Sequence, residues 1–84
     1  MTEHRYEARA LAAVVVTLRC DAGMTQAKLA EKAGVAERTV QNIEYGKRPQ
    51  PLILAAVARA LGMTSAELRQ AAEAEDAGPE AKAS

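Results

Sequence analysis

The sequence predicts an all-α protein, a single compact bundle of five short helices. Alanine, leucine and valine recur at the i, i+3 and i+4 spacing of amphipathic helices, and glycine or proline separates one periodic stretch from the next. Apolar residues make up 49% of the chain and aromatic residues only 2%, so aliphatic side chains must fill the core. A chain of 84 residues suffices for one small domain of this kind.

The first helix is expected from about Tyr6 to Asp21. Its apolar residues fall on one face at helical spacing: Leu11, Val14, Val15 and Leu18. Val16 lies off this face and is either an exposed valine or a contact for a partner. Cys20, the only cysteine, excludes an internal disulfide and is expected to pack against the core rather than serve a redox function. Residues 1–6 are expected to be frayed.

A second, shorter helix is expected over residues 25–33. Thr25 can cap its N-terminus, and its apolar residues lie on one side: Leu29, Ala30 and Ala33. Gly34 ends this helix, because glycine adopts a positive φ at little cost. Val35 then fills the corner of a tight turn.

A third helix follows the turn from near Ala36, with Val40 and Ile43 facing inward. Ala36 has no side-chain acceptor for the N-cap position, which costs about 1 kcal/mol, and Glu37 near the positive end of the helix dipole offsets part of this cost. The outward face carries side chains that form hydrogen bonds: Glu37, Arg38, Thr39, Gln41, Asn42 and Tyr45. An apolar inner face with such an outer face is typical of a helix that enters the major groove of DNA.

A loop over residues 46–51 follows, because Pro49 and Pro51 cannot continue a helix. The fourth helix is expected over residues 52–61, and Gly62 ends it. Its apolar residues face inward at helical spacing: Leu54, Val57, Ala58 and Leu61.

Thr64 and Glu67 have the spacing of a capping box, so a fifth helix is expected to begin there. Residues 77–84, with the sequence AGPEAKAS, have the composition of a disordered tail. The folded domain is therefore expected to span residues 7–76.

The chain resembles the helix-turn-helix domains of the Cro/C1-repressor type, the Xre family. The matching residues follow the family's order and spacing: Leu18, Arg19, Gly23, Met24, Thr25, Gln26, Leu29, Ala30, Ala33, Gly34, Val35, Thr39, Val40, Ile43, Glu44, Gly46, Arg48, Pro49, Leu54, Ala58, Leu61, Gly62 and Leu68. The resemblance covers most of the chain. It implies a compact five-helix Cro/C1-repressor-like bundle in which the second and third helices form the helix-turn-helix.

The resemblance implies that Glu37, Arg38 and Asn42 contact bases. Arg38 can donate two hydrogen bonds to guanine, and Asn42 can pair with adenine through two hydrogen bonds. Glu37 can accept from cytosine and also repels misplaced phosphates. Gln41 could contact a base or a phosphate. Alternatively, Glu37 and Arg38 belong to a solvated charged face.

The resemblance also implies phosphate contacts and one structural pair. The phosphate-contacting residues would be Gln26, Thr39, Tyr45, Lys47 and Arg48. The ring of Tyr45 could instead pack on the core. Arg19 and Glu44 match residues that form a partly buried ion pair between the first and third helices of many family members, and we expect this pair to be structural.

The net charge of zero is divided unevenly along the chain. Residues 18–59 hold seven basic and four acidic residues, a net charge of +3. Residues 64–84 hold two basic and five acidic residues, a net charge of −3. A modestly basic region beside an acidic end fits a DNA-binding protein with weak non-specific affinity.

An enzyme is not expected. His4 is the only histidine and lies near the N-terminus, so a His- and Cys-based zinc site is not expected. There is no Ser–His or Cys–His pairing on a suitable scaffold and no glycine-rich phosphate loop, and we expect no cofactor. The chain has no long apolar run and no signal-peptide pattern, so we expect a cytoplasmic protein without membrane contact.

These observations predict a sequence-specific, DNA-binding transcriptional regulator, a repressor that binds an inverted repeat of double-stranded DNA as a homodimer. The dimer surface is expected on the fifth helix and the loop before the fourth. A phage repressor or Cro and an antitoxin both fit, with a toxin or an antirepressor as a protein partner. The alternative is a protein-interaction module that kept the fold without binding DNA.

Overall fold

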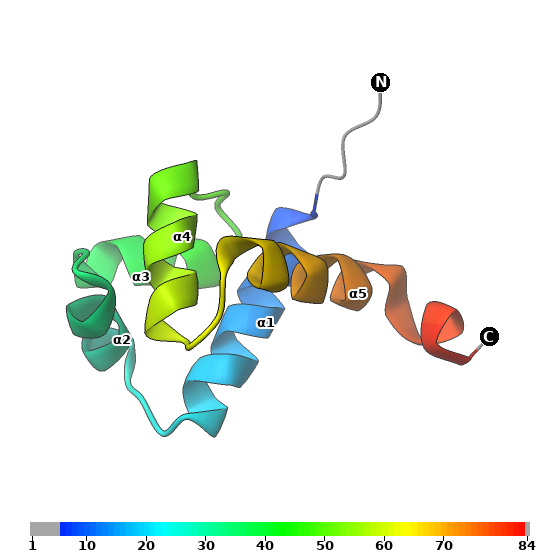
Figure 1. The fold of residues 1–84 in the computed structure, drawn as a ribbon, viewed down its shortest axis with the longest axis horizontal. Coiled ribbons are helices and arrows are strands. Elements are labelled where there is room, and N and C mark those ends of the chain that lie inside the picture. The colour runs from blue at the N-terminus through cyan, green and yellow to red at the C-terminus, as the bar shows by residue number, and fades with distance from the viewer. Residues whose placement is uncertain (1–5, 84) are drawn as a thin grey trace.

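The computed structural model describes residues 6–83, and the side chains of residues 6–76. Five helices and no strand form within these residues (Figure 1). This confirms the predicted all-α, five-helix fold. The helices are α1 (Ala8–Asp21), α2 (Gln26–Ala33), α3 (Glu37–Glu44), α4 (Pro51–Ala60) and α5 (Ser65–Ala83).

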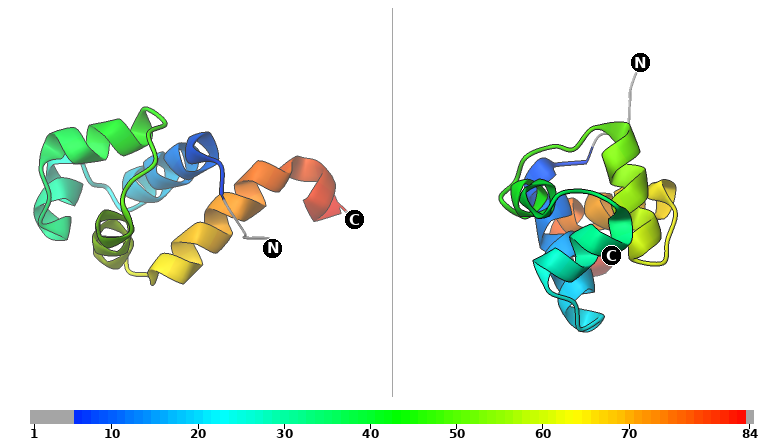
Figure 2. Two further views of the ribbon diagram at one scale, coloured as in Figure 1. Left: turned by 90° about the horizontal axis from the view of Figure 1, so that it is seen from above. Right: turned by 90° about the vertical axis from the view of Figure 1, so that its left-hand side faces the viewer.

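The helices contact one another in a ring: α1 packs against α3 and α5, α4 packs against α2 and α5, and α2 packs against α3. The pair α2 and α3 lies at one end of the molecule, and the C-terminal part of α5 lies at the opposite end (Figures 1 and 2). The largest fully buried side chains are aliphatic, as the composition predicted: Leu11, Val15, Leu29, Val40, Val57 and Leu68. Burying each one stabilises the fold by about 1.5–3 kcal/mol.

Two predicted helix starts are capped by side chains. The Thr25 hydroxyl accepts a hydrogen bond from the Lys28 backbone N–H at 3.0 Å. Thr64 and Glu67 form the reciprocal capping box, with hydrogen bonds of 2.8 and 3.1 Å. The helix α4 begins at Pro51, one residue earlier than expected, because proline fits the first turn of a helix.

The helix α3 lacks a side-chain cap at Ala36. Replacing Ala36 with Ser is expected to raise the free energy of unfolding by about 0.5–1 kcal/mol, because the hydroxyl would accept a hydrogen bond from the first turn of α3. Urea unfolding followed by circular dichroism measures the change. Ala36→Val is the matched control, since valine supplies no acceptor, and equal stability of the two variants would contradict the prediction.

Tyr6 belongs to the core, which corrects the prediction that residues 1–6 are frayed. Its side chain is only 7% exposed, and the Arg48 guanidinium lies 4.4 Å from the centre of its ring. The Tyr6 carbonyl also accepts a hydrogen bond from Arg48 Nη2 at 2.7 Å. These contacts bring together residues far apart in the sequence, so local periodicity could not indicate them. The prediction for residues 1–5 lies outside the described residues.

Cys20 is exposed, so the prediction that it packs against the core is wrong. At 100° per residue, Cys20 lies on the side of α1 opposite the buried Leu11 and Val15. Its neighbours on that side, Ala13 and Thr17, are exposed as well.

The prediction of a disordered tail over residues 77–84 is wrong for residues 77–83, which continue α5. Alanine, glutamate and lysine favour a helix in this segment. Pro79 removes one backbone donor without ending the helix, and the ribbon of α5 changes direction before its last turn (Figure 1). Ser84 lies outside the described residues.

Within residues 6–83, no single helix is long and apolar enough to cross a membrane. The helix α4 and the first part of α5 reach that length and composition only together, and a bend of 92° separates them.

Candidate nucleic-acid interface

The helices α2 and α3 form a compact pair joined by a tight turn. Gly34 takes a positive φ of 75° at the end of α2, and the Val35 N–H donates to the Ala30 carbonyl at 3.0 Å. Val40 and Ile43 then bury one face of α3 in the core. The opposite face of α3 is left open to solvent, in the orientation that the sequence predicted.

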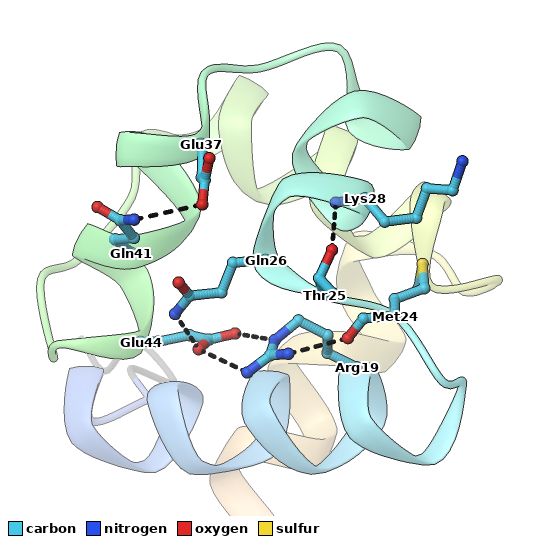
Figure 3. A network of polar contacts seen from close by, with 8 residues as sticks. All are labelled: Arg19, Met24, Thr25, Gln26, Lys28, Glu37, Gln41 and Glu44. Atoms are coloured by element: carbon cyan, nitrogen blue, oxygen red, sulfur yellow. Dashed lines mark hydrogen bonds and ion pairs between the residues drawn. The ribbon is translucent and has the colours of Figure 1, made fainter.

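The outward face of α3 carries polar side chains at helical spacing. Glu37, Arg38 and Gln41 are exposed, and Thr39 and Asn42 are half-buried. Gln41 Nε2 lies 3.5 Å from a Glu37 carboxylate oxygen (Figure 3), a distance at the weak limit of hydrogen bonding. The two groups therefore restrain each other little.

A depression of about 480 Å³ gathers most of the predicted contact residues. It lies between the polar face of α3, the first residue of α2 and α1. Its lining consists of Val16, Gln26, Arg38, Gln41, Asn42, Glu44 and Tyr45. We call it the α3 depression. Val16 and Glu44 line the depression without being predicted DNA contacts, and both are half-buried.

A second, smaller depression of about 230 Å³ adjoins the first, and Asn42 lines both. It is lined by the predicted phosphate-contacting residues that do not line the α3 depression, namely Thr39, Lys47 and Arg48, and by other residues of the loop after α3. Its lining consists of Thr39, Asn42, Ile43, Lys47, Arg48, Pro49, Gln50 and Ile53. Glu37 lines neither depression.

Tyr45 and Arg48 differ in their contacts with the rest of the protein. Tyr45 is 88% exposed, so its ring does not pack on the core. Arg48 stacks on Tyr6 and donates a hydrogen bond to its carbonyl, so its guanidinium is already held by the protein. The structure thus gives Arg48 a structural contact that the sequence did not indicate.

Arg19 of α1 and Glu44 of α3 form a bidentate ion pair (Figure 3). Arg19 Nε lies 2.6 Å from Glu44 Oε2, and Nη2 lies 3.1 Å from Oε1. The side chains are 15% and 7% exposed, respectively. Hydrogen bonding to Glu44 raises the pKa of Arg19 above its usual range, against a smaller lowering by burial, so the guanidinium stays charged.

Both a protein-family model and solved structures match this chain. A model of the helix-turn-helix family matches residues 17–68, more than half of the chain. The chain belongs to the Cro/C1-type helix-turn-helix family.

Two crystal structures of the clp gene regulator ClgR from Corynebacterium glutamicum resemble this helix-turn-helix protein, each with 32% sequence identity. The first match covers 81% of this chain and 88% of that chain with a TM-score of 0.71. The second covers 90% and 85% with a TM-score of 0.72. Together with the family, these similarities support a DNA-binding transcription regulator.

Gln26, like Arg48, has a side-chain partner that the sequence did not indicate. Its side-chain Nε2 donates to Glu44 Oε1 at 2.8 Å (Figure 3), although the helix-turn-helix resemblance suggested a phosphate contact. The two residues lie 18 positions apart on different helices. A pattern confined to one helix carries no signal for such a pair.

Proposed function

We propose that this helix-turn-helix protein is a sequence-specific transcriptional repressor that places α3 in the major groove of its operator. The convergence of Arg38, Gln41 and Asn42 on one exposed face, with the α3 core residues buried behind them, supports this proposal. Arg38 would donate to guanine O6 and N7, and Asn42 would pair with adenine N6 and N7. Exposed Glu37 would accept from cytosine N4.

Phosphate contacts would flank these base contacts. Lys47 and Thr39 line the second depression, beside the loop after α3, and Tyr45 extends into solvent at the end of α3. Arg48 would add positive charge while its stacking on Tyr6 holds the loop that carries Lys47. Such contacts orient a protein on the duplex without specifying sequence.

We further propose that the protein acts as a homodimer on an inverted repeat. One module of this size covers too little DNA for high specificity, and two half-sites about one helical turn apart multiply it. The dimer surface would comprise α5 and the loop before α4. Leu52, at the start of α4, is 84% exposed and adds apolar area beside that loop.

The protein would act in the cytoplasm without catalysing a reaction. The description of ClgR as a gene regulator supports the regulatory assignment. Either a phage repressor or Cro-like regulator or an antitoxin-like regulator fits the proposal. A toxin or an antirepressor would then be the protein partner, and the acidic α5 is the surface proposed for it.

Selection of bound sites from random-sequence duplex DNA tests the proposal. We expect enrichment of an inverted repeat, with binding that weakens steeply as salt is added because phosphate contacts release counterions. No enrichment at low salt by the folded protein would contradict the proposal. Salt-insensitive binding of a protein partner instead would favour an interaction module that does not bind DNA.

A further inference from the structure

Glu44 joins three helices through one carboxylate. Its Oε2 accepts from Arg19 Nε of α1, and its Oε1 accepts from both Arg19 Nη2 and Gln26 Nε2 of α2. Arg19 Nη1 also donates to the Met24 carbonyl at 2.9 Å, in the segment before α2. We call these four residues the Glu44 network (Figure 3).

The Glu44 network lies at the end of the α2–α3 pair that is remote from the turn. Gly34 and Ala36 join the C-terminus of α2 to the N-terminus of α3. Gln26 is the first residue of α2 and Glu44 is the last residue of α3, so their hydrogen bond connects the other two ends (Figure 3). The angle between α2 and α3 is therefore restrained at both ends.

Glu44 requires these partners for an electrostatic reason. A carboxylate at the C-terminus of a helix faces the negative end of the helix dipole, and α3 has no basic residue in its last turn. Arg19 supplies the opposite charge from α1, and Gln26 supplies a neutral donor from α2. Hydrogen bonds to a buried carboxylate are stronger and more directional than those between neutral groups.

We infer that Gln26 is a positioning residue for base recognition: by donating to Glu44, it sets the orientation in which α3 presents Arg38 and Asn42 to DNA. This inference rests on the proposed function and deepens it. Bidentate contacts to bases tolerate little misalignment, so a small rotation of α3 weakens them. Contacts to phosphates tolerate more, because the charge attraction depends weakly on angle.

A positioning role and a phosphate-contacting role for Gln26 predict different losses of DNA affinity when its side chain is removed. A lost phosphate contact weakens binding about equally for all DNA sequences. A lost positioning residue weakens binding to the operator and leaves binding to unrelated DNA unchanged, so the ratio of the two affinities falls.

The test measures the affinity of wild type and Gln26→Ala for the selected operator and for a scrambled duplex of equal length. We expect Gln26→Ala to bind the operator about tenfold more weakly, with scrambled-duplex binding unchanged. Thr17→Ala, on the exposed side of α1 and outside both depressions, is the control and should change neither affinity by more than about twofold. An equal loss on both duplexes would overturn the inference in favour of a phosphate contact. A wild type without any sequence preference would contradict the proposed function itself.

A second measurement keeps the inference testable if Gln26→Ala does not fold. The side-chain amide protons of Gln26 in isotope-labelled wild-type protein report their own hydrogen bonds in nuclear magnetic resonance spectra. One of the two is expected downfield of the exposed Gln70 amide, both in the free protein and with operator bound. A Gln26 resonance that moves to the exposed position on operator binding would overturn the inference, because Gln26 would then have left Glu44.

Discussion

Replacing Arg19 with Met is expected to lower the free energy of unfolding by about 3 kcal/mol, because it leaves the Glu44 carboxylate buried without its charged partner. Glu44 is only 7% exposed and lies at the C-terminus of α3, where the helix dipole also disfavours negative charge. For a domain of this size, such a loss lowers the melting temperature by more than about 10 °C. Thermal unfolding of the two proteins side by side measures it.

Two further variants show whether the stranded charge is the cause. Arg9→Met makes the same change at an exposed position of α1 and should alter stability by no more than about 0.5 kcal/mol. Adding Glu44→Leu to Arg19→Met should recover most of the loss, because an apolar pair of similar volume can replace a buried ion pair. An unchanged melting midpoint in Arg19→Met would contradict the assigned structural importance of the pair.

The double variant Arg38→Ala/Asn42→Ala is expected to lose sequence-specific DNA binding while remaining folded. Each bidentate base contact discriminates against the wrong base by about 1–3 kcal/mol, so losing two would weaken operator binding by about 2–6 kcal/mol. Both residues lie on the outward face of α3, and Val40 and Ile43 behind them stay in place. Site selection and affinity measurements at one fixed salt concentration test this expectation.

The matched control removes an arginine elsewhere. Arg59→Ala deletes the same charge from an exposed position of α4 that lines neither depression. It should retain the wild-type inverted repeat in the selection. If the double variant enriched the same repeat with wild-type affinity, Arg38 and Asn42 would not contact the bases and α3 would not be the recognition helix.

The helices of this protein could be predicted from the sequence because each depends on local patterns. The spacing of apolar residues, the Thr25 cap, the Thr64–Glu67 capping box and Gly34 all act within a few residues of one another. Cys20 also follows a local pattern: helix geometry alone places it opposite the buried stripe of α1. The general tendency of a free cysteine to be buried does not hold at this position.

The side-chain network around the interface depends instead on contacts between distant residues. Arg48 meets Tyr6 across 42 positions, and Gln26 meets Glu44 across 18. Composition and periodicity carry no information about such pairs, and only the family resemblance suggested Arg19 with Glu44, which lie 25 positions apart. The phosphate contact of Arg48 and the positioning role of Gln26 stay predictions.

The exposed thiol at the end of α1 makes spectroscopic work on this protein simple. Cys20 is the only cysteine among 84 residues, and its side chain is accessible to solvent. A maleimide fluorophore or spin label would therefore attach at one known atom per subunit without any substitution. In a homodimer the two labels would define a single distance, and that distance measured with and without operator would report directly how DNA arranges the subunits.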